Sequence, residues 1–109
     1  LARFTNRVFE PLWNNEHIES VQIVLSEKIG IEGRGQFYDS CGVLRDVVQN
    51  HMLQILALVG MEGPEMLGAR QVRDAKAKVL EHVKVHNVIL GQYDGYRDEP
   101  GVASNSLTE

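Results

Sequence analysis

The amino-acid sequence predicts an α+β fold, and three observations lead to this prediction. Two stretches repeat apolar residues every three or four positions, which is typical of helices. Two short segments are rich in β-branched residues, which is typical of strands. A stretch with three closely spaced glycines separates the first of these strands from the longest helix. With a short helix at the start, the predicted order is helix, strand, glycine-rich loop, long helix, helix and strand.

The first part of the chain supplies the opening helix, the first strand and the loop. Apolar residues recur at a helical spacing through residues 1–10, and Pro11 with the asparagines after it ends the pattern. Residues 21–27, VQIVLSE, alternate in the manner of a strand, with Glu27 at the end. Residues 28–40 contain too many glycines for a helix, so we predict a loop there.

The second part supplies the long helix, another helix and the second strand. Apolar residues form one broad stripe from about residue 40 to residue 61, and EGPE at 62–65 ends that helix. Residues 70–83, RQVRDAKAKVLEHV, repeat the helical period, and residues 87–93, NVILGQY, are typical of a strand. The polar tail, residues 94–109, contains Gly, Pro and Ser and is predicted to be loop or disorder.

Length and charge limit the kinds of function that the chain can have. Its 109 residues are too few for two typical domains, and its opening within an apolar pattern without an N-cap predicts a piece of something longer. Lys and Arg number 11 against 15 Asp and Glu, without a basic stripe, which argues against a nucleic-acid partner. No apolar run has membrane-spanning length, no signal peptide is visible, and the single Cys41 excludes an internal disulfide. We therefore expect a cytoplasmic protein without a membrane partner.

The predicted long helix carries an unusual group of polar residues within RDVVQNHMLQ, residues 45–54. On a regular α-helix His51 falls on the same stripe as Val47, Val48 and Ile55, so its imidazole is expected to face the core. An imidazole with a pKa of about 6.5 suits a general base near neutral pH. A histidine on an apolar face is more often a hydrogen-bonded core residue, so both interpretations stay open from spacing alone.

Two carboxylates are candidates for binding a polyhydroxylated substrate. On a regular α-helix Asp46 lies roughly 140° around the axis from His51 and about 7.5 Å along it, so the two cannot bond directly. Asp46 and Glu27 could converge on one polyol, because carboxylates accept hydrogen bonds from sugar hydroxyls. Asp46 could equally pair with a basic neighbour on the surface, and Glu27 could be an ordinary solvated charge. A carboxylate that orients His51 must come from another segment.

Residues 31–62, IEGRGQFYDSCGVLRDVVQNHMLQILALVGME, resemble the central signature of the glucose-6-phosphate 1-dehydrogenase family. Three further segments resemble the family in the same order: RFTNRVFEPLWN, VRDAKAKVL and VILGQY. The resemblance covers nearly all of residues 2–93, and RDVVQNH together with EGRG at this distance is a specific signal. It implies that residues 1–109 are the N-terminal part of the family's C-terminal domain, in which helices pack on a largely antiparallel sheet.

The resemblance also implies an oxidoreductase of glucose metabolism and roles for three residues. The parent enzyme is expected to oxidise glucose 6-phosphate to 6-phosphoglucono-1,5-lactone by hydride transfer to NADP, the first step of the pentose phosphate pathway. A histidine at the position of His51 is the family's general base, which takes the proton of the anomeric hydroxyl. Glu27 and Asp46 correspond to residues that hydrogen-bond the glucose hydroxyls. The histidine is thus a catalytic candidate through the resemblance and not through its hydrophobic neighbours.

The same resemblance implies that NADP is bound mainly by a Rossmann-like domain that is absent from this chain. Gly30, Gly33 and Gly35 follow the order G-x-x-G-x-G, which is not the dinucleotide fingerprint, so we predict no cofactor-binding residues here. The isolated chain is therefore expected to have no turnover. The implied partner is glucose 6-phosphate, and the parent is expected to be a homodimer or homotetramer.

Other interpretations remain for the chain by itself. It could be a non-catalytic structural fragment whose apolar surfaces contribute interdomain or oligomer contacts. A sugar-binding module without catalysis would need no base, so His51→Ala would leave the activity of the parent intact. His82 and His86 are four residues apart and could seat a metal on one helix face, but no third ligand accompanies them and we predict no metal site.

Overall fold

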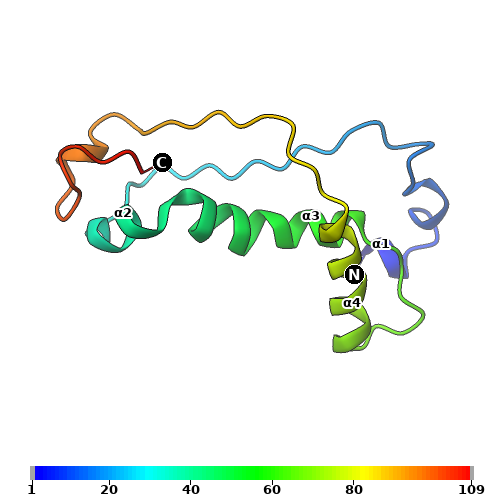
Figure 1. Cartoon of the computed structure of the whole chain (residues 1–109). Helices are drawn as coiled ribbons and strands as arrows, with labels where there is room; N and C mark the ends of the chain where they lie inside the picture. The colour runs from blue at the N-terminus through cyan, green and yellow to red at the C-terminus, as the bar shows by residue number, and fades with distance from the viewer. Residues whose placement is uncertain (1, 109) are drawn as a thin grey trace.

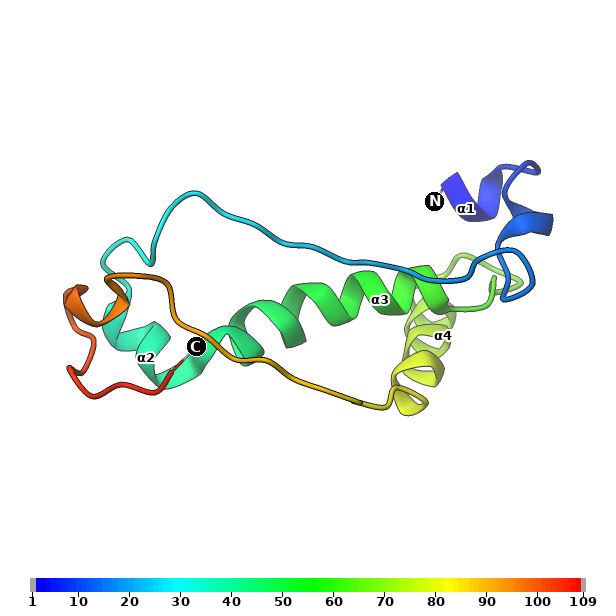
Figure 2. The ribbon, with the colours of Figure 1, turned by 90° about the horizontal axis from the view of Figure 1, so that it is seen from above.

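A computed structural model describes residues 2–108; Leu1 of the predicted first helix and Glu109 of the tail lie outside the described residues. Helices α2 (Gly35–Val43), η2 (Leu44–Met52) and α3 (Leu53–Gly60) follow one another as a long rod (Figure 1). Helix α4 (Ala69–Glu81) turns away steeply from the α3 end of this rod. One coil segment leads from the N-terminal part to α2, and another leads from α4 to the C-terminal part; both run beside the rod (Figures 1 and 2).

The predicted long helix is confirmed, but it begins differently. Helix α2 starts at Gly35, inside the segment that was predicted to be a loop. Gly42 interrupts the helical backbone with φ 74° and ψ 165°, a conformation that is essentially restricted to glycine. The rod therefore consists of a short first helix, a break at Gly42 and a continuous helical run to Gly60.

Helix α4 packs on α3 and confirms the helix predicted at residues 70–83, with slightly earlier ends. Ala57 is fully buried and Met61 is 2% exposed. A Cβ at Gly60 on α3 would lie 3.2 Å from the Val79 side chain on α4, so the glycine lets the two helices approach closely. The Lys76 ammonium also donates a hydrogen bond to the side-chain oxygen of Gln54 on the rod. These contacts hold α4 against the end of the rod.

The first helix is shorter than predicted. Helix α1 covers only Ala2–Thr5, and a 3₁₀ turn, η1 (Glu10–Leu12), follows after an irregular stretch. The Asn6 side chain accepts a hydrogen bond from the backbone N–H of Val8, which favours a turn over a continued helix.

The N-terminal segment caps the C-terminal end of α3. The Arg3 guanidinium donates to the carbonyl oxygens of Leu58 and Val59, at 3.3 and 2.6 Å. The Trp13 indole N–H donates to the same Val59 oxygen at 2.9 Å. The last carbonyls of a helix lack partners within the helix and carry partial negative charge, so these donors satisfy that end.

The prediction of helices packed on a sheet is wrong for this chain, since no strand occurs within residues 2–108. Residues 21–27 and 87–93 are extended, but no backbone hydrogen bond joins them within the described part of the chain. Figure 2 shows the two segments passing along opposite sides of the rod, so neither is a partner for the other. A strand requires a neighbouring strand for its backbone groups, which local sequence preference cannot supply.

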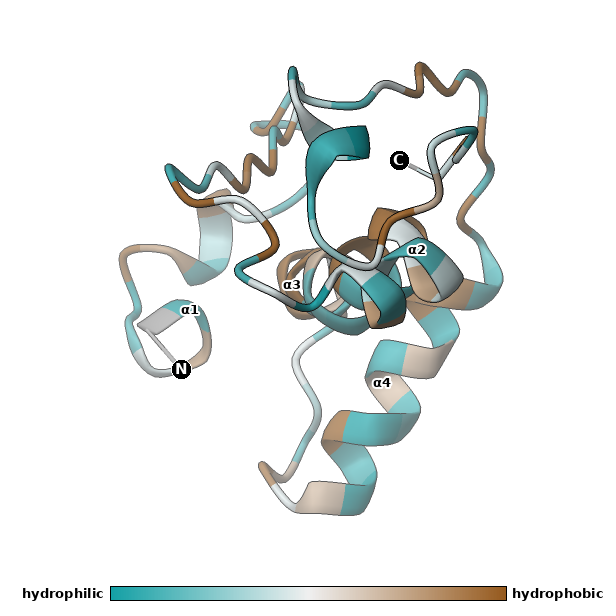
Figure 3. Cartoon of the chain, turned by 90° about the vertical axis from the view of Figure 1, so that its left-hand side faces the viewer, coloured by the Kyte–Doolittle hydropathy of each residue, from teal (hydrophilic) through white to brown (hydrophobic). Residues whose placement is uncertain are grey.

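Apolar side chains of the two extended segments face solvent. Val24 is 71% exposed and Ile89 is 91% exposed, and brown, hydrophobic residues recur along the coil segments in Figure 3. Among the residues that the structure covers, no helix has both the length and the apolar character needed to cross a bilayer.

Candidate functional site

The segment that carries two of the predicted site residues, η2, is a π-helix. The backbone N–H of Leu53 donates to the carbonyl oxygen of Val48, five residues earlier. Such wide turns are rare and are found frequently at functional sites. A turn with this hydrogen bonding takes more than four residues, so the side-chain spacing of a regular α-helix does not apply here.

The wide turn changes the relation between Asp46 and His51. Their separation of five residues is little more than one turn in this geometry, so the two residues lie on roughly the same side of the rod. The expected angle of roughly 140° is wrong for this reason.

The exposure of the two side chains also differs from the expectation. Asp46 is half-buried, whereas His51 is exposed, and Ile55 beside it is 45% exposed. The expected core-facing position of the imidazole is therefore wrong for this chain. Within residues 2–108 no hydrogen bond or ion pair reaches His51, so no carboxylate in this part orients its ring.

The third predicted residue, Glu27, is exposed and lies in the extended segment before α2. Glu27 and Asp46 both affect the pKa of one residue on α2, Tyr38. Burial raises the pKa of the Tyr38 phenol, and the negative charges of Asp46 and Glu27 raise it further, whereas Arg34 lowers it. Tyr38 itself lies on α2, the helix that leads into η2, where Asp46 lies.

The side chain of Asp39, the residue after Tyr38, accepts hydrogen bonds from the C-terminal segment. Its carboxylate accepts from the Ser106 hydroxyl, from the Tyr96 hydroxyl at 3.2 Å and from the Ala103 backbone N–H at 3.3 Å. The Thr108 hydroxyl donates to the Asp39 backbone oxygen at 2.7 Å. The hydrogen bond from Ser106, followed by the backbone bond from Ala103, lowers the pKa of the Asp39 carboxyl against the opposing effect of its burial.

The N-terminus of α2 is closed to a dinucleotide cofactor. Pyrophosphate binding needs a helix N-terminus whose backbone N–H groups a ligand can approach. At the N-terminus of α2, a side chain at Gly35 would collide with the carbonyl oxygen of Pro100, and Gly101 lies against the backbone of Gln36. The C-terminal segment of the chain itself therefore blocks access to the N-terminus of α2.

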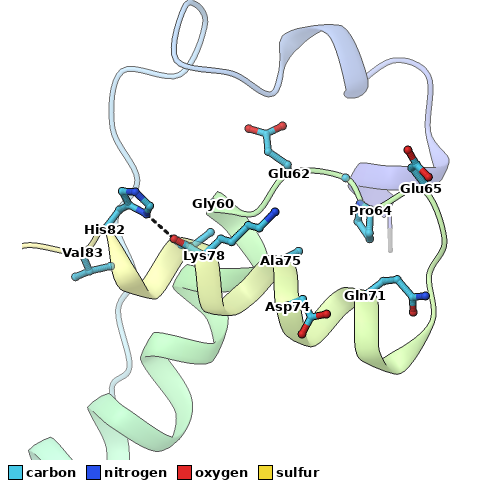
Figure 4. A pocket seen from close by; sticks show the side chains of 12 residues that line it. Gly60, Glu62, Pro64, Glu65, Gln71, Asp74, Ala75, Lys78, His82 and Val83 are labelled. Carbon is cyan, nitrogen blue, oxygen red and sulfur yellow. Dashed lines mark hydrogen bonds between the residues drawn. The ribbon is translucent and has the colours of Figure 1, made fainter.

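One groove on the described surface lies away from the predicted residues. It measures about 820 Å³ and lies between the end of α3, the loop after it and α4 (Figure 4). Glu62, Glu65 and Asp74 line it together with Lys78. A smaller hollow of about 530 Å³ beside η2 is lined by Arg45, Gln49, Asn50, Leu53, Gln54 and Leu80, and includes neither Asp46 nor His51.

The histidine pair does not share a helix face. Helix α4 ends at Glu81, and the His82 ring pairs through Nδ1 with the Lys78 carbonyl oxygen at 2.7 Å. His86 lies beyond the helix in the extended segment. The residues that the structure describes hold no cluster of three potential metal ligands.

Comparison with known proteins identifies the family. Residues 1–109 match the family described as glucose-6-phosphate dehydrogenase, C-terminal domain. The chain belongs to this family. A cytoplasmic glucose-6-phosphate 1-dehydrogenase of Arabidopsis thaliana is 52% identical over 111 residues, covering 99% of this chain and 22% of that protein. A chloroplastic one of Spinacia oleracea is 46% identical over 121 residues, covering 99% of this chain and 21% of that protein.

Solved structures agree with the assignment to the glucose-6-phosphate dehydrogenase family. The enzyme from Mycobacterium avium superposes with a TM-score of 0.92 at 46% identity, covering 98% of this chain and 24% of that one. A glucose-6-phosphate dehydrogenase in complex with its substrate glucose-6-phosphate gives 0.83 at 43% identity, covering 97% and 24%. The chain thus spans about a fifth of the length of the curated relatives that it matches.

Proposed function

We propose that this chain supplies the general base and the sugar-hydroxyl contacts of a glucose-6-phosphate dehydrogenase. His51 takes the proton of the C1 hydroxyl while hydride leaves C1, so that the C1–O bond becomes the carbonyl of the 6-phosphoglucono-1,5-lactone. Glu27 and Asp46 accept hydrogen bonds from the glucose hydroxyls and hold C1 near the imidazole.

One observation carries this proposal: the wide turns of η2 bring Asp46 and His51 onto roughly the same side of the rod. A sugar bound by Asp46 can therefore present its C1 hydroxyl to the imidazole without bending around the helix. His51 is exposed, as a base that contacts substrate requires. Membership of the family supports the same arrangement.

The reaction also needs a hydride acceptor, which the family implies is NADP. The N-terminus of α2 is filled by the chain itself, so we assign NADP binding to a part of the parent enzyme outside these residues. This chain then accepts the proton and binds the sugar hydroxyls. By itself it is expected to have no turnover.

The test is steady-state turnover of glucose 6-phosphate and NADP by the complete enzyme with His51→Asn. Asparagine is similar in size and polar but cannot accept a proton near neutral pH. We expect kcat to fall by roughly 10²–10⁴-fold, the usual contribution of a positioned base, while sugar-phosphate binding persists.

His86→Asn is the matched control, because His86 is also exposed and lies in the extended segment far along the chain from η2. We expect its kcat to equal that of the wild type. An unchanged kcat in His51→Asn at matched folding would show that the proton leaves by another route, as a purely sugar-binding module predicts.

A second role follows from the exposed apolar side chains of the extended segments. Residues 21–27 and 87–93 leave backbone groups and side chains such as Val24 and Ile89 uncovered. In the parent enzyme these segments would pair with other strands and contribute to contacts between domains or subunits of a homodimer or homotetramer.

A cytoplasmic location of the parent is supported by the identity of 52% to a cytoplasmic relative, against 46% to a chloroplastic one.

A further inference from the structure

We propose that Asp39 is a positioning residue for the sugar site: it fastens the C-terminal segment across the two parts of the chain that carry Glu27 and Asp46. This inference rests on the proposed function of those two carboxylates. It concerns how their spacing is fixed, and it assigns no contact between Asp39 and the substrate.

One half of the contact is at Asp39 on α2, twelve residues before the predicted base. The Asp39 carboxylate receives donors from three residues of the segment 96–106, which are 57 to 67 positions away in the chain. Two of these three residues are buried: Ser106 is 7% exposed and Tyr96 is 2% exposed. A carboxylate that accepts several hydrogen bonds in a partly buried place is a strong anchor, because each lost partner leaves a polar group unsatisfied.

The other half of the contact is at the loop that follows Glu27. The space beside Gly30 is filled by the Tyr93 hydroxyl and a carboxylate oxygen of Glu99, which are hydrogen-bonded to each other at 2.9 Å. Ile31, the next residue, is 5% exposed. The C-terminal segment therefore contacts the chain three residues after Glu27.

The aromatic rings join the two halves. Tyr96 lies edge-on to Tyr93, with ring centroids 5.5 Å apart, and edge-on to Tyr38, with centroids 6.2 Å apart. Burial raises the pKa of the Tyr38 phenol, and the charges of Asp46 and Glu27 raise it further. Residues 93–108, which we call the clasp, thus hold the loop after Glu27 and the helix before Asp46 at a fixed distance.

The consequence for the reaction is specific. Loosening the clasp moves Glu27 relative to Asp46, whereas Asp46 and His51 stay together on η2. Binding and recognition of the sugar hydroxyls should weaken, while proton removal from a bound sugar continues. The expected signature is a change in KM and in hydroxyl selectivity with kcat largely retained.

The experiment compares Asp39→Ala, Tyr96→Phe and wild type in the complete enzyme, with glucose 6-phosphate and 2-deoxyglucose 6-phosphate as substrates. Tyr96→Phe keeps the ring contacts and removes one donor to Asp39. A displacement of about 1 Å can cost on the order of 10²-fold, so we expect KM for glucose 6-phosphate to rise about tenfold or more in Asp39→Ala. The ratio of kcat/KM between the two sugars should fall in both variants, with the smaller fall in Tyr96→Phe.

Asp98→Ala is the control, because Asp98 is an exposed aspartate of the same segment without a side-chain hydrogen bond among the described contacts. Its KM and selectivity should equal those of wild type. The inference is overturned if both test variants keep the wild-type KM and selectivity, or if they lose only kcat through a smaller folded fraction. Loss of kcat in His51→Asn is a separate result, so either hypothesis can fail without the other.

Discussion

Gly42 shows how a single residue can determine the course of the rod. Its φ of 74° and ψ of 165° lie in a region that is open to glycine and closed to residues with a Cβ. The backbone on either side is helical, so this one residue allows η2 to leave α2 in a new direction. The orientation of Asp46 and His51 relative to Tyr38 depends on it.

We expect Gly42→Ala to destabilise the complete enzyme by about 1–3 kcal/mol, the usual cost of holding a residue with a Cβ in this backbone region. Thermal unfolding followed by circular dichroism measures the effect as a lower Tm. Gln49→Ala is the control, because Gln49 is exposed on the neighbouring helix η2, where alanine is compatible with the helical backbone. Equal Tm values for the two variants would contradict the structure at Gly42.

At the scale of elements, the clasp depends on the charge of Asp39. Its folded-state pKa is lowered from the ordinary value of 3.8, mainly by the hydrogen bond from Ser106. Protonation is therefore easier in the open state than in the closed one. The carboxylate stabilises the closed clasp fully above pH 3.8, and this contribution is lost as the pH falls below 3.8 through the lower folded value.

We therefore expect the clasp to open in acid before the helices melt. Hydrogen exchange of the Ala103 and Ser106 amides, which donate to Asp39 and to the Ala103 carbonyl, measures this opening. Exchange should accelerate as the pH falls below 3.8, beyond the ordinary effect of pH on unprotected amides. Asp39→Asn cannot titrate, so in this variant the additional acceleration should be absent; its persistence would assign the opening to another group.

Capping of α3 gives a second element-scale prediction. Trp13→Phe keeps the aromatic ring beneath the Arg3 guanidinium, which lies 5.3 Å from the Trp13 ring centroid, and removes only the N–H donor to Val59. We expect a loss of about 0.5–1.5 kcal/mol in unfolding free energy, the net value of one hydrogen bond, measured by urea denaturation. Because Arg3 also donates to Val59, a loss above about 3 kcal/mol would indicate that the indole does more than cap the helix.

The long helical run and α4 were predictable from the sequence because their apolar residues repeat at a local period. The spacing from Val72 to Val83 suffices to predict α4, since helical hydrogen bonds form within the helix itself. The strands were not predictable in the same way. Residues 21–27 have β-branched side chains, but their partners are absent from the described chain, and so is the sheet.

The candidate site was only partly predictable. Asp46, His51 and Glu27 were found through family motifs, and their chemical types fit the proposed reaction. The wide turns of η2 leave no trace in a hydrophobic pattern, so the angle between Asp46 and His51 was predicted wrongly. Asp39 gave no sequence signal either, because its partners are 57 to 69 positions away.

At the scale of the whole molecule, the chain is elongated. A compact protein of this length has a radius of gyration of about 13 Å, from the usual scaling with length. The observed value is 17.9 Å, with extents of 52 × 29 × 25 Å. Few hydrophobic residues are buried: among the described residues they are Ile31, Ala57, Met61 and Tyr96. Such a shape leaves large apolar areas in contact with water.

The isolated chain is therefore expected to associate with itself in a concentration-dependent manner. Sedimentation velocity over a range of concentrations measures this, and Ile89→Lys should weaken it, because a charge on an exposed strand edge opposes pairing. Glu81→Lys, on the exposed end of α4, introduces the same charged residue without removing an apolar side chain. A chain that stays monomeric at high concentration would argue against strand pairing through residues 87–93.

The wide turns of η2 also determine how the rod would respond to losing a residue. A π-turn holds one residue more than an α-turn, so shortening Leu44–Met52 by one exposed residue, such as Gln49, lets that turn relax to α geometry. The face of α3 that meets α4 then keeps its direction. Helix α3 contains no such additional residue. A deletion before Ala57 within α3 would therefore rotate Ala57 out of its buried position by about 100°, the angle per residue of an α-helix. The rod can thus change length at the site without disturbing the packing at its end.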